Sequence, residues 1–155
     1  MLKLRRLGMT MMMIGLMTAA GTPGVLAHSG AVGIIKERMD TMVQLGKSMK
    51  VLAAHMGGKV DYDAGQVKSN AKIIKSHAGD AFLKLFPEGS NAKPSEAKSI
   101  IWADWETFSS MTKKMFEASE ALELVAENKG AAGQAAFSEL AKTCSSCHKV
   151  FRQKK

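Results

Sequence analysis

Cys144-Ser145-Ser146-Cys147-His148 closes the last helical segment of this 155-residue chain. On a helix, residues three and four apart lie on the same side, so both thiols and the imidazole project from one turn. Cys-x-x-Cys-His is the attachment signature of a c-type haem. The thiols add to the two vinyl groups, and the imidazole is held as an axial iron ligand. The motif therefore predicts one covalent haem c on Cys144 and Cys147, with His148 bound to iron.

Three other interpretations of the cysteine pair remain. A thioredoxin-like dithiol requires a strand-to-helix turn, and the sequence shows no convincing strand. A zinc site requires a second pair of Cys or Cys/His ligands, which the sequence does not offer. A disulfide closing so small a loop would constrain the unfolded chain little. Haem attachment is the favoured interpretation.

The first 27 residues are typical of a secretory signal peptide. They combine a basic start, an apolar stretch and a small-residue cleavage site, which are Lys3, Arg5 and Arg6, then Met9 to Ala20, then Val25-Leu26-Ala27. The apolar stretch is shorter than the roughly 20 residues that span a bilayer, and an uncleaved anchor is the alternative. Cleavage leaves residues 28–155, which is enough chain for one domain.

The charge of the chain bears on its partners. The formal net charge is +8, and three of the positive residues lie in the signal segment, which leaves +5. A basic exported protein is expected to meet acidic redox proteins, not nucleic acid. Lys149, Arg152, Lys154 and Lys155 cluster beside the motif, although a solvated helix end gives the same pattern. The predicted location is the periplasm, without membrane contact after cleavage.

Four segments carry apolar residues every three or four positions, and none alternates with period two. We expect helices from about 32 to 56, from 64 to about 83, from about 94 to 128 and from 131 to 151. Pro94 is placed in the first turn of the third helix, a favoured position for proline. The predicted fold is all-α, an antiparallel four-helix bundle with covalent haem c inside it.

The chain resembles the class II cytochromes c, a family that includes cytochrome c′ and the low-spin cytochromes c-556 and that carries its haem motif near the C-terminus. The matching stretches are Lys36-Glu37-Arg38-Met39, Gly46-Lys47-Ser48-Met49, Leu85-Phe86-Pro87, Ile101-Trp102 and the segment from Cys144 to Arg152. The resemblance covers nearly the whole mature chain. It implies the four-helix fold, and family members often form homodimers through the first two helices.

The resemblance also bears on the sixth coordination position of the iron. Aligned through Gly46 and Met49, the chain places Met42 where cytochromes c-556 carry a methionine ligand. Cytochrome c′ usually has a non-coordinating apolar residue there. A methionine on an apolar stripe can equally be a flexible core residue. His148 and Met42 are therefore the expected metal ligands, and a five-coordinate iron is the alternative.

Other residues are assigned smaller roles. Arg38 matches an arginine that lies near the haem propionates in cytochrome c′, and Met39 is expected beside the haem. Arg152 matches the basic residue beside the proximal histidine, although at a helix end it also favours the dipole. The aromatic residues Trp102, Trp105 and Phe108 are candidates for the haem wall or for ordinary core. His28, His55 and His77 are expected not to bind iron.

These residues favour a periplasmic one-electron carrier, because soft thioether sulfur stabilises ferrous iron. The alternative is a five-coordinate cytochrome c′ that binds nitric oxide or carbon monoxide. An enzyme such as a peroxidase is disfavoured, since the first helix offers only Arg38 as a polar group beside Met39, Met42 and Val43.

Overall fold

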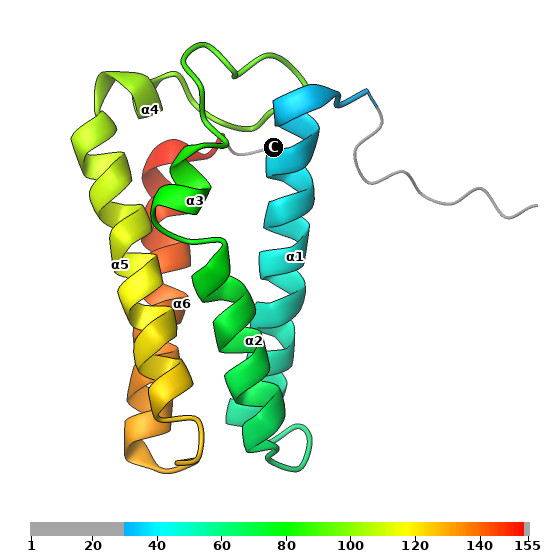
Figure 1. Cartoon of the computed structure of the whole chain (residues 1–155), viewed down its shortest axis with the longest axis vertical. Coiled ribbons are helices and arrows are strands. Elements are labelled where there is room, and N and C mark those ends of the chain that lie inside the picture. The colour runs from blue at the N-terminus through cyan, green and yellow to red at the C-terminus, as the bar shows by residue number, and fades with distance from the viewer. Residues whose placement is uncertain (1–29, 154–155) are drawn as a thin grey trace, which may run out of the picture.

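A computed structural model of the chain describes residues 30–153. Four long helices form the body: α1 (Gly33–Met56), α2 (Ala64–Ser76), α5 (Trp105–Leu124) and α6 (Ala131–Phe151). Two helices of a single turn, α3 (Asp80–Leu83) and α4 (Ile100–Ala103), lie at the end of the bundle where α1 begins and α6 ends (Figure 1). The prediction of an all-α four-helix bundle is confirmed.

The helices bury one apolar stripe each, as their 3.6-residue periodicity requires. The largest apolar side chains of the core with 2% exposure or less come from all four long helices and from the two short ones: Leu52, Val67, Ile74, Phe82, Ile101, Phe108, Leu122 and Leu140. Helices α5 and α6, α2 and α5, and α1 and α2 pack extensively, whereas α1 and α6 make much sparser contact. The bundle is therefore open between its first and last helices.

The second predicted helix ends earlier than the sequence pattern indicates. Helix α2 begins at an N-cap in which the Asp63 carboxylate accepts a hydrogen bond from the Gln66 amide at 3.0 Å. It stops at Ser76, because Gly79 adopts φ 59° and ψ −135°, a conformation that side chains rarely tolerate. The Gly79 amide instead donates to the Thr112 carbonyl of α5 at 3.2 Å. The apolar residues beyond this break continue in α3.

The prediction that Pro94 opens the third helix is wrong. Regular helix begins only at α4, and the backbone of Asp104 (φ −124°, ψ 54°) separates α4 from α5. Asp104 then caps α5, because its carboxylate accepts a hydrogen bond from the Thr107 amide at 3.4 Å. The chain after Pro94 is extended, and Ala97 forms an antiparallel bridge with Arg152. Tertiary pairing with the end of α6 therefore replaces a helical turn.

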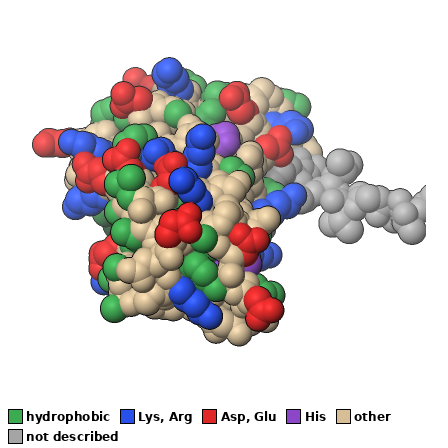
Figure 2. Space-filling view, turned by 60° about the horizontal axis from the view of Figure 1, so that its bottom comes forward, with side chains coloured by type: hydrophobic (Ala, Val, Ile, Leu, Met, Phe, Trp, Pro, Cys, Tyr) green, Lys and Arg blue, Asp and Glu red, His purple; other side chains and the backbone are tan. Residues whose placement is uncertain are grey.

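Two surface observations complete the fold. None of the helices in residues 30–153 is long and apolar enough to cross a membrane. On the face drawn in Figure 2, Lys and Arg side chains are interspersed with Asp and Glu, so this face carries no patch of a single sign. The predicted signal segment, His28, Lys154 and Lys155 lie outside the described residues.

Candidate haem site

A cavity of about 380 Å³ opens between α1 and α6, at the end of the bundle that carries α3 and α4. A second cavity of about 260 Å³ shares five residues of its lining, which are Met42, Gly46, Phe82, Cys147 and His148. Ligand pockets in proteins commonly measure about 300–1,000 Å³. The two cavities together therefore offer room for a large, mainly apolar ligand beside the Cys-x-x-Cys-His turn.

Helix α6 presents the predicted attachment residues to this space. Cys147 and His148 line both cavities, and Cys144 lines the second. Both cysteines are free and partly buried. Burial, with the neighbouring Cys144, raises the pKa of the Cys147 thiol to about 11, and burial is the main cause that lowers the pKa of His148. Both shifts favour the uncharged form, and the neutral imidazole is the form in which histidine binds metals.

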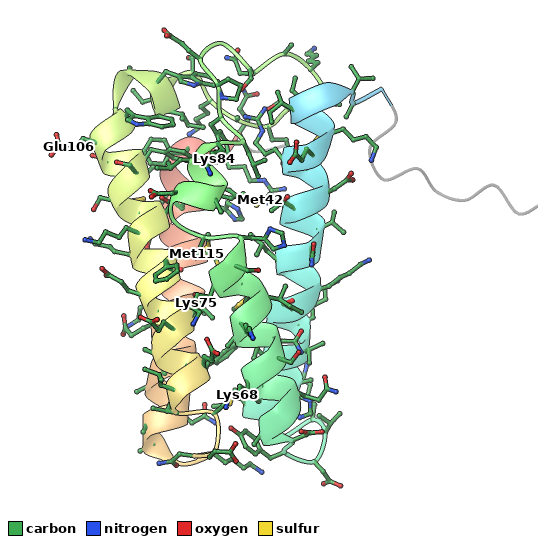
Figure 3. All side chains as sticks on the ribbon, in the orientation of Figure 1. Met42, Lys68, Lys75, Lys84, Glu106 and Met115 are labelled. Atoms are coloured by element: carbon green, nitrogen blue, oxygen red, sulfur yellow. The ribbon has the colours of Figure 1, made fainter. Side chains whose placement is uncertain are left out.

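Helix α1 provides the opposite wall. Met39, Met42 and Val43 line the larger cavity, and Met42 also lines the smaller one. Met42 is half-buried and lies on the inward side of α1, in the half of the bundle near α3 (Figure 3). The structure thus brings the Met42 thioether and the His148 imidazole to one space from two helices that barely touch.

Arg38 is a buried cation at the same site. Its side chain is only 3% exposed, and it lines the larger cavity. The guanidinium donates to the Ser90 carbonyl and, at 3.3 Å each, to the Ser90 and Ser95 hydroxyls. It also lies 4.4 Å from the centre of the Phe86 ring, within the range of a cation–π contact. Burial lowers the pKa of Arg38, yet an arginine stays charged in proteins.

Arg152 lies at the end of α6, four residues after His148. Its Nε donates to Glu96 Oε2 at 2.6 Å, and both residues line the larger cavity. The predicted iron ligands, propionate partner and neighbouring residues therefore line one cavity, with Cys144 at the second: Arg38, Met39, Met42, Cys147, His148 and Arg152.

The aromatic wall is only partly the one expected. Phe108 lines the larger cavity, but Trp102 and Trp105 do not. Trp102 packs against the core, where its indole Nε1 donates to the Phe86 carbonyl at 3.1 Å. Most of the remaining lining comes from aromatic residues, from the loop before α4 and from α4 itself, and none of these residues was assigned a haem role from the sequence: Phe82, Phe86, Ser95, Glu96, Ala97, Ile101 and Phe151. Phe86, Ile101 and Phe151 had a signal, since all three fall in stretches that carry the family resemblance.

The two described histidines outside the motif lie away from the cavities. His55 is buried near the end of α1, and its Nδ1 is 2.9 Å from the Asp61 carbonyl. His77 caps the end of α2 through its backbone amide. Neither residue lines either cavity. Within residues 30–153, no group of three or more His, Cys, Asp or Glu side chains forms a metal cluster.

The donor set of the cavity suits a haem c. Two thiols on one helical turn would hold the two vinyl groups, and the adjacent imidazole would bind the iron. The apolar lining suits a porphyrin, and the buried Arg38 adds a positive charge to the cavity wall. A four-helix bundle with this donor set defines a covalent haem protein of the cytochrome type.

Comparisons with known proteins agree. The family model for cytochrome c′ matches residues 33–152. Cytochrome c-556 of Agrobacterium tumefaciens (strain II Chrys) is 36% identical over 125 residues, covering 79% of this chain and 99% of its own length. Cytochrome c′ of Cereibacter sphaeroides is 30% identical over 143 residues, covering 88% of this chain and 93% of its own length.

Solved structures show the same fold. The cytochrome c′ from Rhodobacter Spheriodes superimposes with a TM-score of 0.73 at 29% identity, covering 79% of this chain and 96% of that one. The chain belongs to the class II cytochrome c family, which is also called the cytochrome c′ family. It is a cytochrome that carries haem c on its Cys-x-x-Cys-His motif.

Proposed function

We propose that this cytochrome is a one-electron carrier whose iron is bound by His148 and Met42. One observation carries the proposal: the Met42 thioether and the His148 imidazole line the same two cavities from opposite helices. A soft sulfur ligand favours ferrous iron, and a second ligand restricts changes of coordination between oxidation states. The similarity to cytochrome c-556 of Agrobacterium tumefaciens supports it.

The roles of the chain follow from its geometry. Haem c supplies a one-electron couple between ferric and ferrous iron when it is bound. Cys144 and Cys147 hold the group, and His148 provides a neutral nitrogen because burial lowers its pKa. Buried Phe82, Phe86 and Phe108 exclude water from the cavity wall, which strengthens the electrostatic influence of the charges there.

A five-coordinate protein that binds nitric oxide or carbon monoxide is the second candidate. Arg38 favours it, since this residue matches a position typical of cytochrome c′ and lies buried in the cavity wall. Relatives named cytochrome c′ are also similar to this chain, at 27% to 30% identity. The two candidates differ in whether the Met42 sulfur occupies the sixth position.

Absorption spectra of the ferric and ferrous holoprotein test the assignment. We expect a low-spin ferric spectrum with a sulfur-to-iron charge-transfer band, and Met42→Leu should convert it to high spin. Met39→Leu is the matched control, because Met39 lines only the larger cavity one turn earlier on α1, and it should stay low-spin. A high-spin wild-type spectrum, or carbon monoxide binding that Met42→Leu does not alter, would favour the gas-binding candidate.

We also propose that residues 1–27 are a signal peptide and that the domain of residues 28–155 works in the periplasm with acidic redox partners, not as an enzyme. Covalent haem attachment consumes both thiols of the motif, which would otherwise face an oxidising compartment in an exported protein. The mass of the secreted holoprotein should match cleavage after Ala27 with one added haem. A mass that includes residues 1–27 would indicate a retained anchor, and robust peroxide turnover would contradict the non-enzymatic role.

A further inference from the structure

A short extended segment joins the two walls of the haem cavity. We call Ser95 to Lys98 the strap. At its start, the Ser95 hydroxyl accepts a hydrogen bond from the Arg38 guanidinium of α1 at 3.3 Å. Further along, the Lys98 amide donates to the Phe151 carbonyl at 3.0 Å, at the end of α6. The strap therefore connects α1 with α6 where these helices make sparse contact.

The strap is fixed to the end of α6 by backbone pairing at Glu96 and at the two residues after it. The Gln153 amide donates to the Glu96 carbonyl at 2.7 Å, and Ala97 bridges Arg152 in antiparallel fashion. The Lys98 ammonium adds a bond of 2.9 Å to the Val150 carbonyl. These bonds fix the Glu96 backbone against Arg152 and Gln153, the residues that follow α6. The position of the Glu96 carboxylate is therefore set by main-chain geometry as well as by its own ion pair.

The Glu96 carboxylate and the Arg152 guanidinium form an ion pair at 2.6 Å within the lining of the larger cavity. The Glu96 side chain is 25% exposed and that of Arg152 is 51% exposed. Both charges lie beside His148. The Arg152 amide donates to the His148 carbonyl at 3.2 Å, and Glu96, Arg152 and His148 line the same cavity. The two charges have opposite signs, so they have opposite electrostatic effects at this end of the cavity.

We propose that Glu96 is a positioning residue that neutralises Arg152 beside His148 and so keeps the reduction potential of the haem lower than Arg152 alone would set it. The inference rests on the proposed role of His148 as an iron ligand. A positive charge near the iron favours the ferrous form, which carries one positive charge less, and a paired carboxylate cancels this effect. Because Glu96 pairs with Arg152 at 2.6 Å, the cancellation acts at short range.

Redox titration of the holoprotein tests the inference. Glu96→Gln keeps the size of the side chain and removes its charge, and we expect the potential to rise. The ratio of ferrous to ferric protein at a fixed potential should increase about threefold, or roughly 30 mV at 59 mV per tenfold change for one electron. Arg152→Gln should lower the potential by a similar amount, and the double variant should return close to wild type.

The opposite signs separate this inference from a purely structural role. If the pair only fastened the strap, both single variants would break the same contact and shift the potential in the same direction. That result, or an unchanged potential in Glu96→Gln, would overturn the proposal. Because Arg152→Gln tests the same charge balance from the other side, the proposal stays testable if Glu96→Gln does not fold.

Glu139→Gln is the matched control. Glu139 is on α6 in an exposed ion pair with Lys142 at 2.6 Å, and it lines neither cavity. It lies nine residues before His148, about 13 Å along a helix, which exceeds the Debye length of about 10 Å at 0.1 M salt. Its removal should leave the potential unchanged. The absorption spectra of the variants should remain those of wild type. The wild-type spectrum tests whether His148 and Met42 bind the iron, whereas the potentials of the variants test the role of Glu96, so the two proposals can fail separately.

Discussion

Phe108 supports the haem cavity from the core, and its removal provides a quantitative test of the fold. The side chain is 1% exposed and lines the larger cavity. Its ring contacts four others, with centroid distances of 4.8 Å to Phe86, 5.2 Å to Phe151, 5.6 Å to Trp105 and 6.4 Å to Phe82. Phe151 follows His148 by three residues, so this cluster also fixes the end of α6.

We expect Phe108→Ala to lower the free energy of unfolding by about 4 kcal/mol. Truncation of a buried Phe to Ala costs about 3–5 kcal/mol, and each favourable aromatic pair adds about 0.5–1.5 kcal/mol beyond the buried area. For a domain of this size, 1 kcal/mol corresponds to roughly 4 °C in Tm, so the midpoint should fall by about 15 °C. Urea unfolding of the holoprotein, followed by circular dichroism, measures the free energy of unfolding, and thermal unfolding measures the Tm.

Phe116→Ala is the control for this prediction. Phe116 is also on α5 but is 37% exposed, and it should cost less than about 2 kcal/mol because a half-exposed ring leaves a smaller cavity. Equal losses for the two variants would refute the reasoning that the Phe108 cluster is the core of the haem end. A loss in Phe108→Ala of less than about 1 kcal/mol would do the same.

Three further outcomes follow from the contacts. Glu123 forms an ion pair with Lys75 at 2.5 Å, and the Lys75 ammonium is the main cause that lowers the pKa of Glu123. The pair therefore stabilises the fold at pH values above the ordinary pKa of a glutamate, and this stabilisation is lost as the pH falls through the lowered pKa of Glu123. Glu123→Gln should therefore make the free energy of unfolding fall less steeply at acid pH. An unchanged dependence on pH would contradict this. Gly79→Ala should cost about 1–3 kcal/mol in urea unfolding, because φ is 59° there, and a neutral result would show that the α2–α3 turn tolerates a side chain. Tyr62→Phe should cost about 1 kcal/mol in thermal unfolding, since the Tyr62 hydroxyl donates to the Ala126 carbonyl at 2.5 Å; a gain in stability would count against that bond.

Local chemistry explains which parts of the site could be predicted. Cys144, Cys147 and His148 lie on one helical turn, so their relative placement depends on helix geometry alone. Met42 and Arg38 were identified through the family resemblance, and the structure then brought both to the same cavity as His148. Their axial and propionate roles stay predictions for the spectra. The loop between α3 and α4 had no periodic signal, which is why the helix expected at Pro94 was wrong.

The sequence by itself determined the haem c attachment, the four amphipathic helices and the bundle, because spacing along a helix and apolar periodicity are local properties. Only the tertiary structure decided what surrounds the haem. Glu96 and Arg152 are 56 residues apart and meet through main-chain pairing of a segment with no secondary-structure signature. The Phe108 cluster likewise joins rings from α3, α5, α6 and the loop after α3. Contacts between distant segments depend on how whole helices pack, and no single stretch of sequence encodes them.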